Sequence, residues 1–156
     1  MDIFICRHGQ AESYAASDRE RSLTEQGRID NLKLARLFAE QKPEIDLALC
    51  SPYLRAQQTA ADLQSILGSL RFSESESLVP ESDVQKLLSL LDDLAETSNV
   101  ESVLLVGHNP LFSDLLSLLV DGGMNQRQMG TSNLASLTCK YVAPGFGELQ
   151  YLLTPS

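Results

Sequence analysis

The sequence predicts a three-layer α/β/α fold, in which a mostly parallel sheet has helices on both faces and an antiparallel edge. Three observations support this class. Short β-prone runs at residues 2–6, 45–50 and 102–106 alternate with longer segments of helical composition. A Ser-Pro or Asn-Pro pair follows two of these runs closely, and two further β-prone stretches end the chain. The 156 residues are expected to form a single domain, 1–156.

The first expected strand is the apolar run at residues 2–6, which ends at Arg7. Residues 24–41 have the length and composition of a helix, although their apolar stripe is irregular. Thr24 is placed to cap the start of this helix, and Pro43 lies just beyond its end. The chain is therefore expected to begin with a strand, a loop and a long helix.

The second strand is expected at residues 45–50, because this run is short and apolar. Ser51 and Pro52 then predict the start of a helix, with serine as the N-cap and proline as the first helical residue. After that helix, residues 69–82 have the composition of a loop, with room for a strand near 71–72.

The clearest helical pattern follows, because six apolar residues recur at helical spacing and form one face: Val84, Leu87, Leu88, Leu91, Leu94 and Ala95. Residues 102–106 are a β-prone run that ends at Gly107. Asn109 and Pro110 repeat the pattern of a cap followed by proline and predict a helix that extends to about Val120.

The last two strands are expected at residues 135–142 and 147–153, as an antiparallel hairpin at one edge of the sheet. Parallel sheets with helices on both faces bind ligands beyond the carboxyl ends of their strands. The residues that follow the first three strands are therefore the candidates for a functional site.

Composition excludes several classes of function. The formal net charge of −9 argues against general nucleic-acid binding, and no apolar run is long enough to cross a bilayer. The first residues lack the features of a secretory signal, and the three cysteines fit reduced core residues of a cytoplasmic protein: Cys6, Cys50 and Cys139. No metal or cofactor is expected, because Arg7 beside His8 would repel a cation.

Three strand ends carry residues suited to an anion. Arg7 and His8 follow the first strand, and His108 follows the third. Arg55 lies one turn into the helix after the second strand, and helical side chains lean toward the helix start, so it can reach the same region. Either histidine alone could be structural, but both stand beside a glycine at a predicted turn, and the chain has no other histidine.

These residue types suit phosphoryl transfer. Arg7 and Arg55 can hold phosphoryl oxygens through planar forks, while His8 attacks phosphorus and His108 donates to an oxygen. His8 would then carry a covalent phosphoryl group that water removes. Gly9 allows the backbone to approach the phosphate closely.

Four motifs in this order resemble the histidine phosphatase superfamily, the phosphoglycerate mutase-like group. They are Arg7-His8-Gly9, Leu23-Thr24-Glu25-Gln26-Gly27, Ser51-Pro52-Tyr53-Leu54-Arg55-Ala56-Gln57-Gln58-Thr59-Ala60 and Gly107-His108-Asn109-Pro110. The resemblance implies that His8 is the nucleophile and that Arg7, Arg55 and His108 hold the phosphoryl group. It also implies that Asn109 can add its backbone N–H, while Arg21 either lines the mouth of the site or is a surface residue.

Within that superfamily the chain most resembles the SixA-type phosphohistidine phosphatases. The resemblance implies a monomeric enzyme without a cofactor that dephosphorylates histidine-phosphotransfer or phosphocarrier proteins. Other members use a glutamate near a tryptophan as general acid, and this chain has no tryptophan. Glu81 is then either a substitute acid or a charged residue near a helix start. Two alternatives remain, a phosphatase for small phosphate esters and a phosphoprotein-binding module with low turnover.

Overall fold

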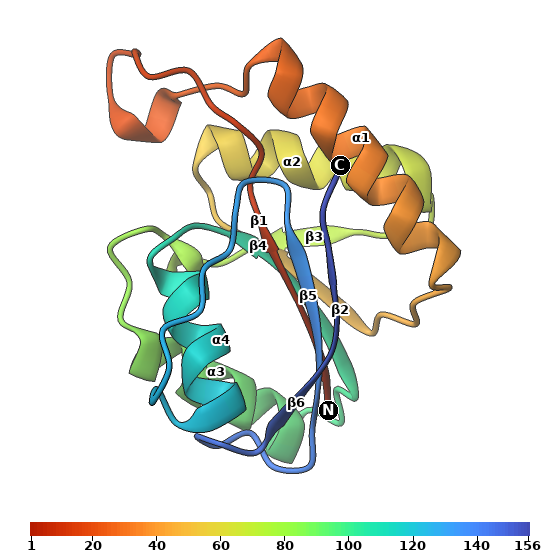
Figure 1. Ribbon diagram of the computed structural model, residues 1–156, viewed down its shortest axis with the longest axis vertical. Helices are drawn as coiled ribbons and strands as arrows, with labels where there is room; N and C mark the ends of the chain where they lie inside the picture. Colours follow the sequence, from red (N-terminus) through yellow and green to blue (C-terminus); the bar gives the residue numbers. More distant parts are fainter.

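The computed structural model describes residues 1–156 and contains one six-stranded sheet, shown in Figure 1. The order of the strands across the sheet is β3-β2-β4-β1-β5-β6. In chain order the strands are β1 (Asp2–Arg7), β2 (Leu47–Cys50), β3 (Phe72–Glu74), β4 (Ser102–Gly107), β5 (Leu134–Cys139) and β6 (Gly147–Leu153). The four strands from β3 to β1 are parallel, whereas β5 and β6 pair in antiparallel fashion at one edge.

Helices cover both faces of the sheet, which confirms the predicted fold class. They are α1 (Glu25–Glu40), α2 (Leu54–Leu67), α3 (Val84–Thr97) and α4 (Leu111–Asp121), together with the 3-10 helices η1 (Asp18–Glu20) and η2 (Glu76–Leu78). Phe38 and Leu63 pack α1 and α2 against one face of the sheet. Leu91 and Phe112 pack α3 and α4 against the other face.

Two adjacent parallel strands bring the histidine motifs together. Arg7 and Gly107 are partners at the ends of β1 and β4, and the N–H of His8 donates to the carbonyl of Gly107 at 2.9 Å. On the other side of β4, the N–H of Ser51 donates to the carbonyl of Val106 at 3.0 Å. The ends of β1, β4 and β2 therefore lie side by side, as the strand-end argument requires.

The start of α2 differs from the sequence prediction. The helix begins at Leu54 after Tyr53, so Ser51 is not its N-cap and Pro52 is not its first residue. The hydroxyl of Ser51 instead accepts the N–H of Tyr53 at 3.2 Å and contacts His108. The helix start predicted from the Ser-Pro pair was wrong, because the hydroxyl of Ser51 binds His108 in the site instead of capping the helix.

The start of α4 is also displaced, by one residue. The helix begins at Leu111 with Pro110 at the capping position, where proline provides no side-chain cap. The side chain of Asn109 still serves the first turn, because its oxygen accepts the N–H of Ser113 at 3.2 Å. A helix was therefore correctly predicted after β4, but its first residue is Leu111 and not Pro110.

The long loop after β1 is tied to the start of α1. Thr24 caps the helix as predicted, since its hydroxyl accepts the N–H of Gly27 at 2.9 Å. The N–H of Thr24 donates to the carbonyl of Gln10 at 2.9 Å. A Cβ atom on Gly27 would lie only 2.2 Å from that carbonyl oxygen, so only glycine fits there.

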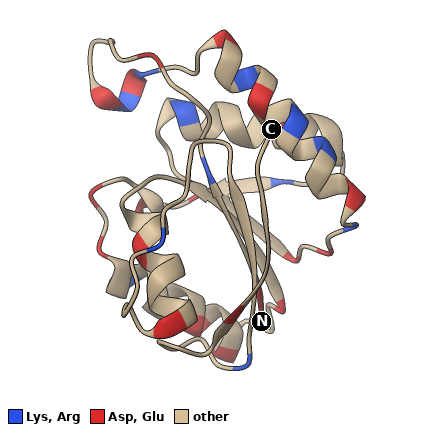
Figure 2. Ribbon diagram, in the orientation of Figure 1, with Lys and Arg blue, Asp and Glu red and all other residues tan.

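The surface and the buried thiols fit the sequence interpretation. Figure 2 shows acidic segments spread over both helical layers rather than gathered in one patch. The three cysteines are free and buried in the core. None of the helices combines the length and the apolar character that a membrane span requires.

Candidate active site

His8 is held as the tautomer whose Nε2 atom has a free electron pair. The side chain is only 7% exposed, and Nδ1 lies 2.7 Å from the carbonyl oxygen of Gly9. A carbonyl can only accept, so Nδ1 carries the hydrogen. Nε2 then accepts, and the Nε–H of Arg55 donates to it at 3.3 Å. Nε2 is therefore the nucleophilic atom of the ring.

The surroundings of His8 keep the ring neutral. Burial, together with the positive charges of Arg55, Arg7 and Arg21, lowers its pKa from the usual 6.5 to about 4, although the hydrogen bond to Gly9 acts to raise it. A neutral imidazole has the electron pair that attack on phosphorus requires. The arginines therefore have two roles, because the positive charges that attract an anion also keep the imidazole of His8 unprotonated.

His108 lies beside His8, with the ring centres 5.1 Å apart and the ring planes at 56°. Its Nε2 atom is 2.7 Å from the hydroxyl oxygen of Ser51, and Tyr53 packs its ring edge-to-face at 5.2 Å. Burial and the neighbouring positive groups lower the pKa of His108 to about 2. Nδ1 is buried without a partner in the protein, so it can donate to a bound oxygen once Ser51 donates to Nε2.

Arg7 presents unused donors to the same region. One terminal N–H donates to the carbonyl of Met129 at 2.9 Å, while Nε is buried and has no partner in the protein. Burial and the charge of Arg55 lower the pKa of Arg7, yet the guanidinium group stays a cation. A group with spare donors and a fixed position is suited to hold one oxygen of a phosphoryl group.

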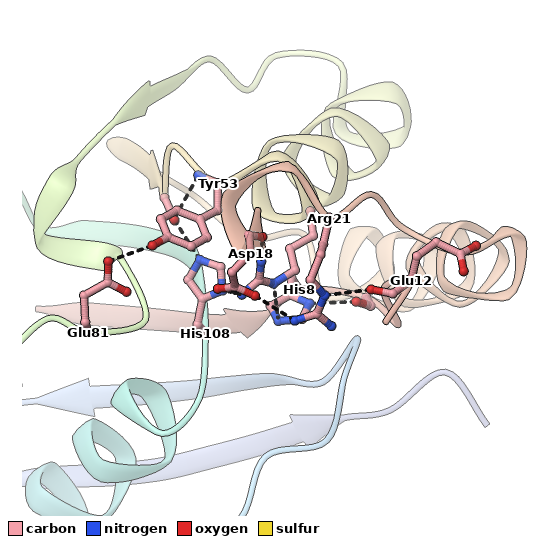
Figure 3. A network of polar contacts seen from close by, with 10 residues as sticks. His8, Glu12, Asp18, Arg21, Tyr53, Glu81 and His108 are labelled. Carbon is pink, nitrogen blue, oxygen red and sulfur yellow. Dashed lines mark hydrogen bonds and ion pairs between the residues drawn. The ribbon is translucent and has the colours of Figure 1, made fainter. Parts of the chain in front are cut away.

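Arg55 is only 4% exposed and extends from the first turn of α2 to His8. Its other two nitrogens contact Asp18 in η1. One donates to the backbone carbonyl at 2.8 Å, and the other lies 3.2 Å from a carboxylate oxygen. Figure 3 shows Asp18 beside His8 at the mouth of the site. Asp18 was not among the residues predicted for the site, because one acidic residue in a polar loop carries no recognisable signal in the sequence.

Arg21 lines the mouth of the site, which was one of its two predicted positions. Its Nε atom donates to the carbonyl of Glu12 at 2.7 Å, and a terminal nitrogen lies 2.9 Å from a carboxylate oxygen of Asp18. Its charge is among the causes that lower the pKa of His8. In Figure 3 the carboxylate of Glu12 points away from this cluster, so the positive charge of Arg21 faces the site.

Glu81 reaches the site only through Tyr53. Its carboxylate accepts the hydroxyl of Tyr53 at 2.6 Å, and this hydrogen bond raises the pKa of Tyr53. Figure 3 shows the tyrosine hydroxyl pointing toward Glu81, on the side of the ring away from His8. The glutamate therefore orients a ring that packs on His108, and the structure gives it no direct contact with either histidine.

The structure places Gly9 against α1 and the side chain of Asn109 beside Met129. The N–H of Gly9 donates to the hydroxyl of Thr59 at 3.0 Å, and a Cβ atom there would lie 2.8 Å from the side chain of Asn31. Gly9 is thus required for packing against α1. The backbone N–H of Asn109 is not used within the protein, but its side chain donates to the carbonyl of Met129 at 2.9 Å.

A network of buried hydrogen bonds holds the backbone of His8 in place. Asn31 donates to the hydroxyl of Thr59 at 3.1 Å and to Asp62 at 3.1 Å, and it accepts the hydroxyl of Ser132 at 2.7 Å. The N–H of Ser132 in turn donates to the carbonyl of His8 at 3.1 Å. Thr59 belongs to the motif that begins at Ser51, whereas Asn31 and Ser132 belong to no motif of the sequence.

The arrangement is suited to a tetrahedral anion. Two neutral imidazoles and two guanidinium groups, all from strand ends or a helix start, converge on one region. The chain contains no group of three or more His, Cys, Asp or Glu side chains placed to hold a metal ion. The available chemistry is nucleophilic attack by Nε2 of His8, with positive groups around the charge that develops.

Comparisons with known proteins point to the same chemistry. Residues 3–79 match the family model described as histidine phosphatase superfamily (branch 1). The chain is 35% identical to phosphohistidine phosphatase SixA of Escherichia coli, over 99% of this chain and 94% of that protein. It is also 32% identical to a phosphohistidine phosphatase SixA homolog of Haemophilus influenzae, over 76% of this chain and 77% of the relative.

A solved structure shares the fold over nearly its whole length. The structure of the protein histidine phosphatase SixA complexed with tungstate matches with a TM-score of 0.89 and 34% identity. The match covers 99% of this chain and 97% of that one. An α-ribazole phosphatase from Shigella flexneri has a TM-score of 0.76 at 18% identity, covers 100% of this chain and 98% of its own, and shows a common fold.

Proposed function

The chain belongs to the histidine phosphatase superfamily, and we propose that it is a protein phosphohistidine phosphatase that works through a phospho-His8 intermediate. The observation that carries this proposal is the state of His8. Nδ1–H donates to Gly9, and Nε2 presents its electron pair beside Arg55. The two SixA relatives support the choice of a phosphohistidine substrate.

The first chemical step transfers the phosphoryl group to the enzyme. Nε2 of His8 attacks phosphorus in line with the bond to the substrate nitrogen. As the new P–N bond forms, the old P–N bond breaks, and its electron pair stays on the substrate imidazole. Arg7, Arg55 and His108 hold the three phosphoryl oxygens, where the negative charge resides.

The second step releases phosphate. Water attacks the phosphorus of phospho-His8, the P–N bond breaks, and its electron pair returns to Nε2. Both hydrogens of the water remain on the phosphate, so His8 ends in its starting tautomer. The carbonyl of Gly9 accepts from Nδ1–H in both states and supports the positive charge that the phosphorylated ring carries.

The proposed substrates are proteins that carry phosphohistidine, such as histidine-phosphotransfer domains of signalling relays or phosphocarrier proteins. A transfer from one imidazole to another leaves the type of bond unchanged, so the first step is nearly balanced in free energy. We place the enzyme in the cytoplasm as a monomer, and its three free buried thiols fit a reducing compartment.

The proposal is tested by comparing three reactions of the purified protein. One contains a phosphohistidine-bearing phosphotransfer domain, one contains a panel of small phosphate esters, and one contains buffer alone. Phosphate release from the phosphotransfer domain, lost in His8→Ala, supports the proposal. Preferential turnover of an ester would instead make the protein a small-molecule phosphatase. Tight binding without phosphate release would make it a binding module.

A further inference from the structure

The carboxylate of Asp18 lies between Arg55 and Arg21, at the entrance to the proposed phosphoryl site. One of its oxygens lies 3.2 Å from Arg55, and the other lies 2.9 Å from Arg21. The side chain is 53% exposed, so it stands at the entrance and not in the core. Its backbone carbonyl also accepts from Arg55 at 2.8 Å, which fixes η1 over the site independently of the carboxylate.

A carboxylate in this position works against a plain phosphate ester. The hydrogen bond with Arg21 and the charge of Arg55 lower the pKa of Asp18, so it carries a negative charge at neutral pH. The carboxylate of Asp18 and a phosphoryl group near the same arginine repel each other, because both are negatively charged. Asp18 also occupies guanidinium N–H groups that could otherwise donate to phosphoryl oxygens. An ester substrate would gain from the removal of this charge, so its presence calls for a cationic partner in the complex.

We propose that Asp18 is the residue that selects phosphohistidine over phosphate esters, by binding the N–H of the substrate's phosphorylated imidazole ring. This inference rests on the proposed function. The ring nitrogen that is not bonded to phosphorus carries a hydrogen when the ring is protonated, and this cationic N–H is a strong donor to a carboxylate. The leaving oxygen of an ester has no such group beside it.

The charge of the ring makes this contact productive for the transfer. The protonated ring leaves as a neutral imidazole, because it keeps the hydrogen on its far nitrogen and takes the electron pair of the breaking P–N bond. The positive charge passes to the ring of His8, which then carries the phosphoryl group. Asp18 thus favours the protonated form of the substrate, in which the imidazole is a good leaving group.

Other carboxylates near the entrance do not fit this role. Glu81 is bound to the hydroxyl of Tyr53, and Glu20 accepts from the hydroxyl of Ser17 at 3.0 Å. Glu12 contacts Arg21 only through its backbone carbonyl. Asp18 is the one whose carboxylate lies on a pocket arginine, and Glu20, two residues away in the same 3-10 helix, offers a matched control.

The test compares Asp18→Asn with Glu20→Gln on two substrates, a phosphohistidine-bearing phosphotransfer domain and p-nitrophenyl phosphate. Asparagine keeps the shape of the side chain and the backbone contact with Arg55 while it removes the charge. The quantity measured is the ratio of kcat/KM for phosphohistidine to kcat/KM for the ester. A general effect on Arg55 cancels in this ratio, because both substrates need that arginine.

We expect Asp18→Asn to lower the ratio by about tenfold or more, with ester turnover rising, because one charge-assisted hydrogen bond is lost. Asp18→Glu, which keeps the charge, should preserve the preference better than asparagine does, and Glu20→Gln should leave the ratio unchanged. A smaller change in Asp18→Asn, or an equal change in Glu20→Gln, overturns the inference. If the unmodified enzyme does not act on phosphohistidine at all, the proposed function itself fails.

Discussion

The Nε–H of Arg55 donates to Nε2 of His8 at 3.3 Å, so the arginine contacts the very atom that attacks phosphorus. The arginine and the phosphorus compete for one electron pair. Attack on a substrate therefore requires this N–H to turn to a phosphoryl oxygen, a shift of one hydrogen bond within the same guanidinium group. The nucleophile and the oxyanion donor are thus positioned by each other.

Replacing Arg55 by alanine is expected to lower kcat/KM by about 100- to 1,000-fold, or about 3–4 kcal/mol of transition-state stabilisation. The variant loses both a positive charge at the phosphoryl oxygens and the partner of His8. Arg71→Ala is a suitable control, because Arg71 is exposed and contacts only carbonyls of the loop after α2. A loss under tenfold for Arg55→Ala, measured by steady-state kinetics, would contradict its place in the site.

The two histidine rings are expected to stay neutral far below the usual pKa of 6.5. The pKa values are lowered to about 4 for His8 and to about 2 for His108, so neither ring should protonate as the pH falls from about 8 to about 5. Proton NMR of the ring C–H signals measures this directly. A ring whose signals shift with a midpoint above about pH 6 would disagree with the burial and charge described for it.

The same lowered pKa values predict how stability depends on pH. Unfolded histidines bind protons below about pH 6.5, whereas the folded protein resists protonation of His8 until about pH 4. The unfolded chain then holds more protons in this window, and the free energy of unfolding falls as the pH falls through it. Urea unfolding at several pH values should show a weaker dependence in His8→Gln than in the unmodified protein.

Ser113 is expected to act on catalysis through Arg7, although it touches no reacting atom. Its hydroxyl donates to the side chain of Asn109 at 2.9 Å and accepts the N–H of Met129 at 3.1 Å, and Asn109 donates to the Met129 carbonyl. This closed ring holds the carbonyl that anchors Arg7. Ser113→Ala should lower kcat/KM by about tenfold, since about 1–2 kcal/mol of positioning is lost.

Rescue experiments separate this role from a general loss of stability. Ser113→Thr keeps the hydroxyl and should recover most of the activity, while Ser89→Ala, an exposed serine of another helix, should have no effect. The loss should appear mainly in KM for a phosphohistidine substrate, because Arg7 binds the phosphoryl group before and during transfer. An unchanged KM and kcat in Ser113→Ala would show that the ring does not position Arg7.

Gly27→Ala is expected to destabilise the protein by about 1–3 kcal/mol, as overpacking of a closed site does. The added methyl group would meet the Gln10 carbonyl, which is backbone and cannot turn aside. Gly123→Ala is the comparison, because a Cβ there meets no atom within 4 Å and only the positive φ of 85° is strained. Urea unfolding of both variants should show the larger loss at Gly27, and the reverse order would be inconsistent with the contact.

The fold and the central residues of the site were predictable because their signals are local. Strand and helix patterns place Arg7, His8 and His108 at the ends of neighbouring strands, and the parallel pairing of β1 with β4 brings them together. The Ser-Pro pattern was misleading at Ser51, because its hydroxyl binds His108 instead of capping a helix. The contact between Ser51 and His108 joins residues far apart in the chain, so local helix propensity does not predict it.

Asp18 shows the remaining limit of sequence reasoning. It lies in the polar loop between β1 and α1, residues 8–24, whose path over the site depends on the contacts of Arg55 and Arg21. Nothing in its neighbours distinguishes it from the solvated carboxylates elsewhere in an acidic chain. The same holds for Asn31, whose polar network becomes visible only once α1 and α2 pack together.

The central claim is that Nε2 of His8 receives the phosphoryl group, and rapid quenching tests it most directly. The enzyme is mixed with a phosphotransfer domain labelled with radioactive phosphate on histidine, quenched in alkali within milliseconds to seconds, and digested for peptide mapping. The account predicts a transient, acid-labile label on the peptide that contains His8, and no label in His8→Ala. Phosphate release with no label on His8, or with the label on His108, would contradict it.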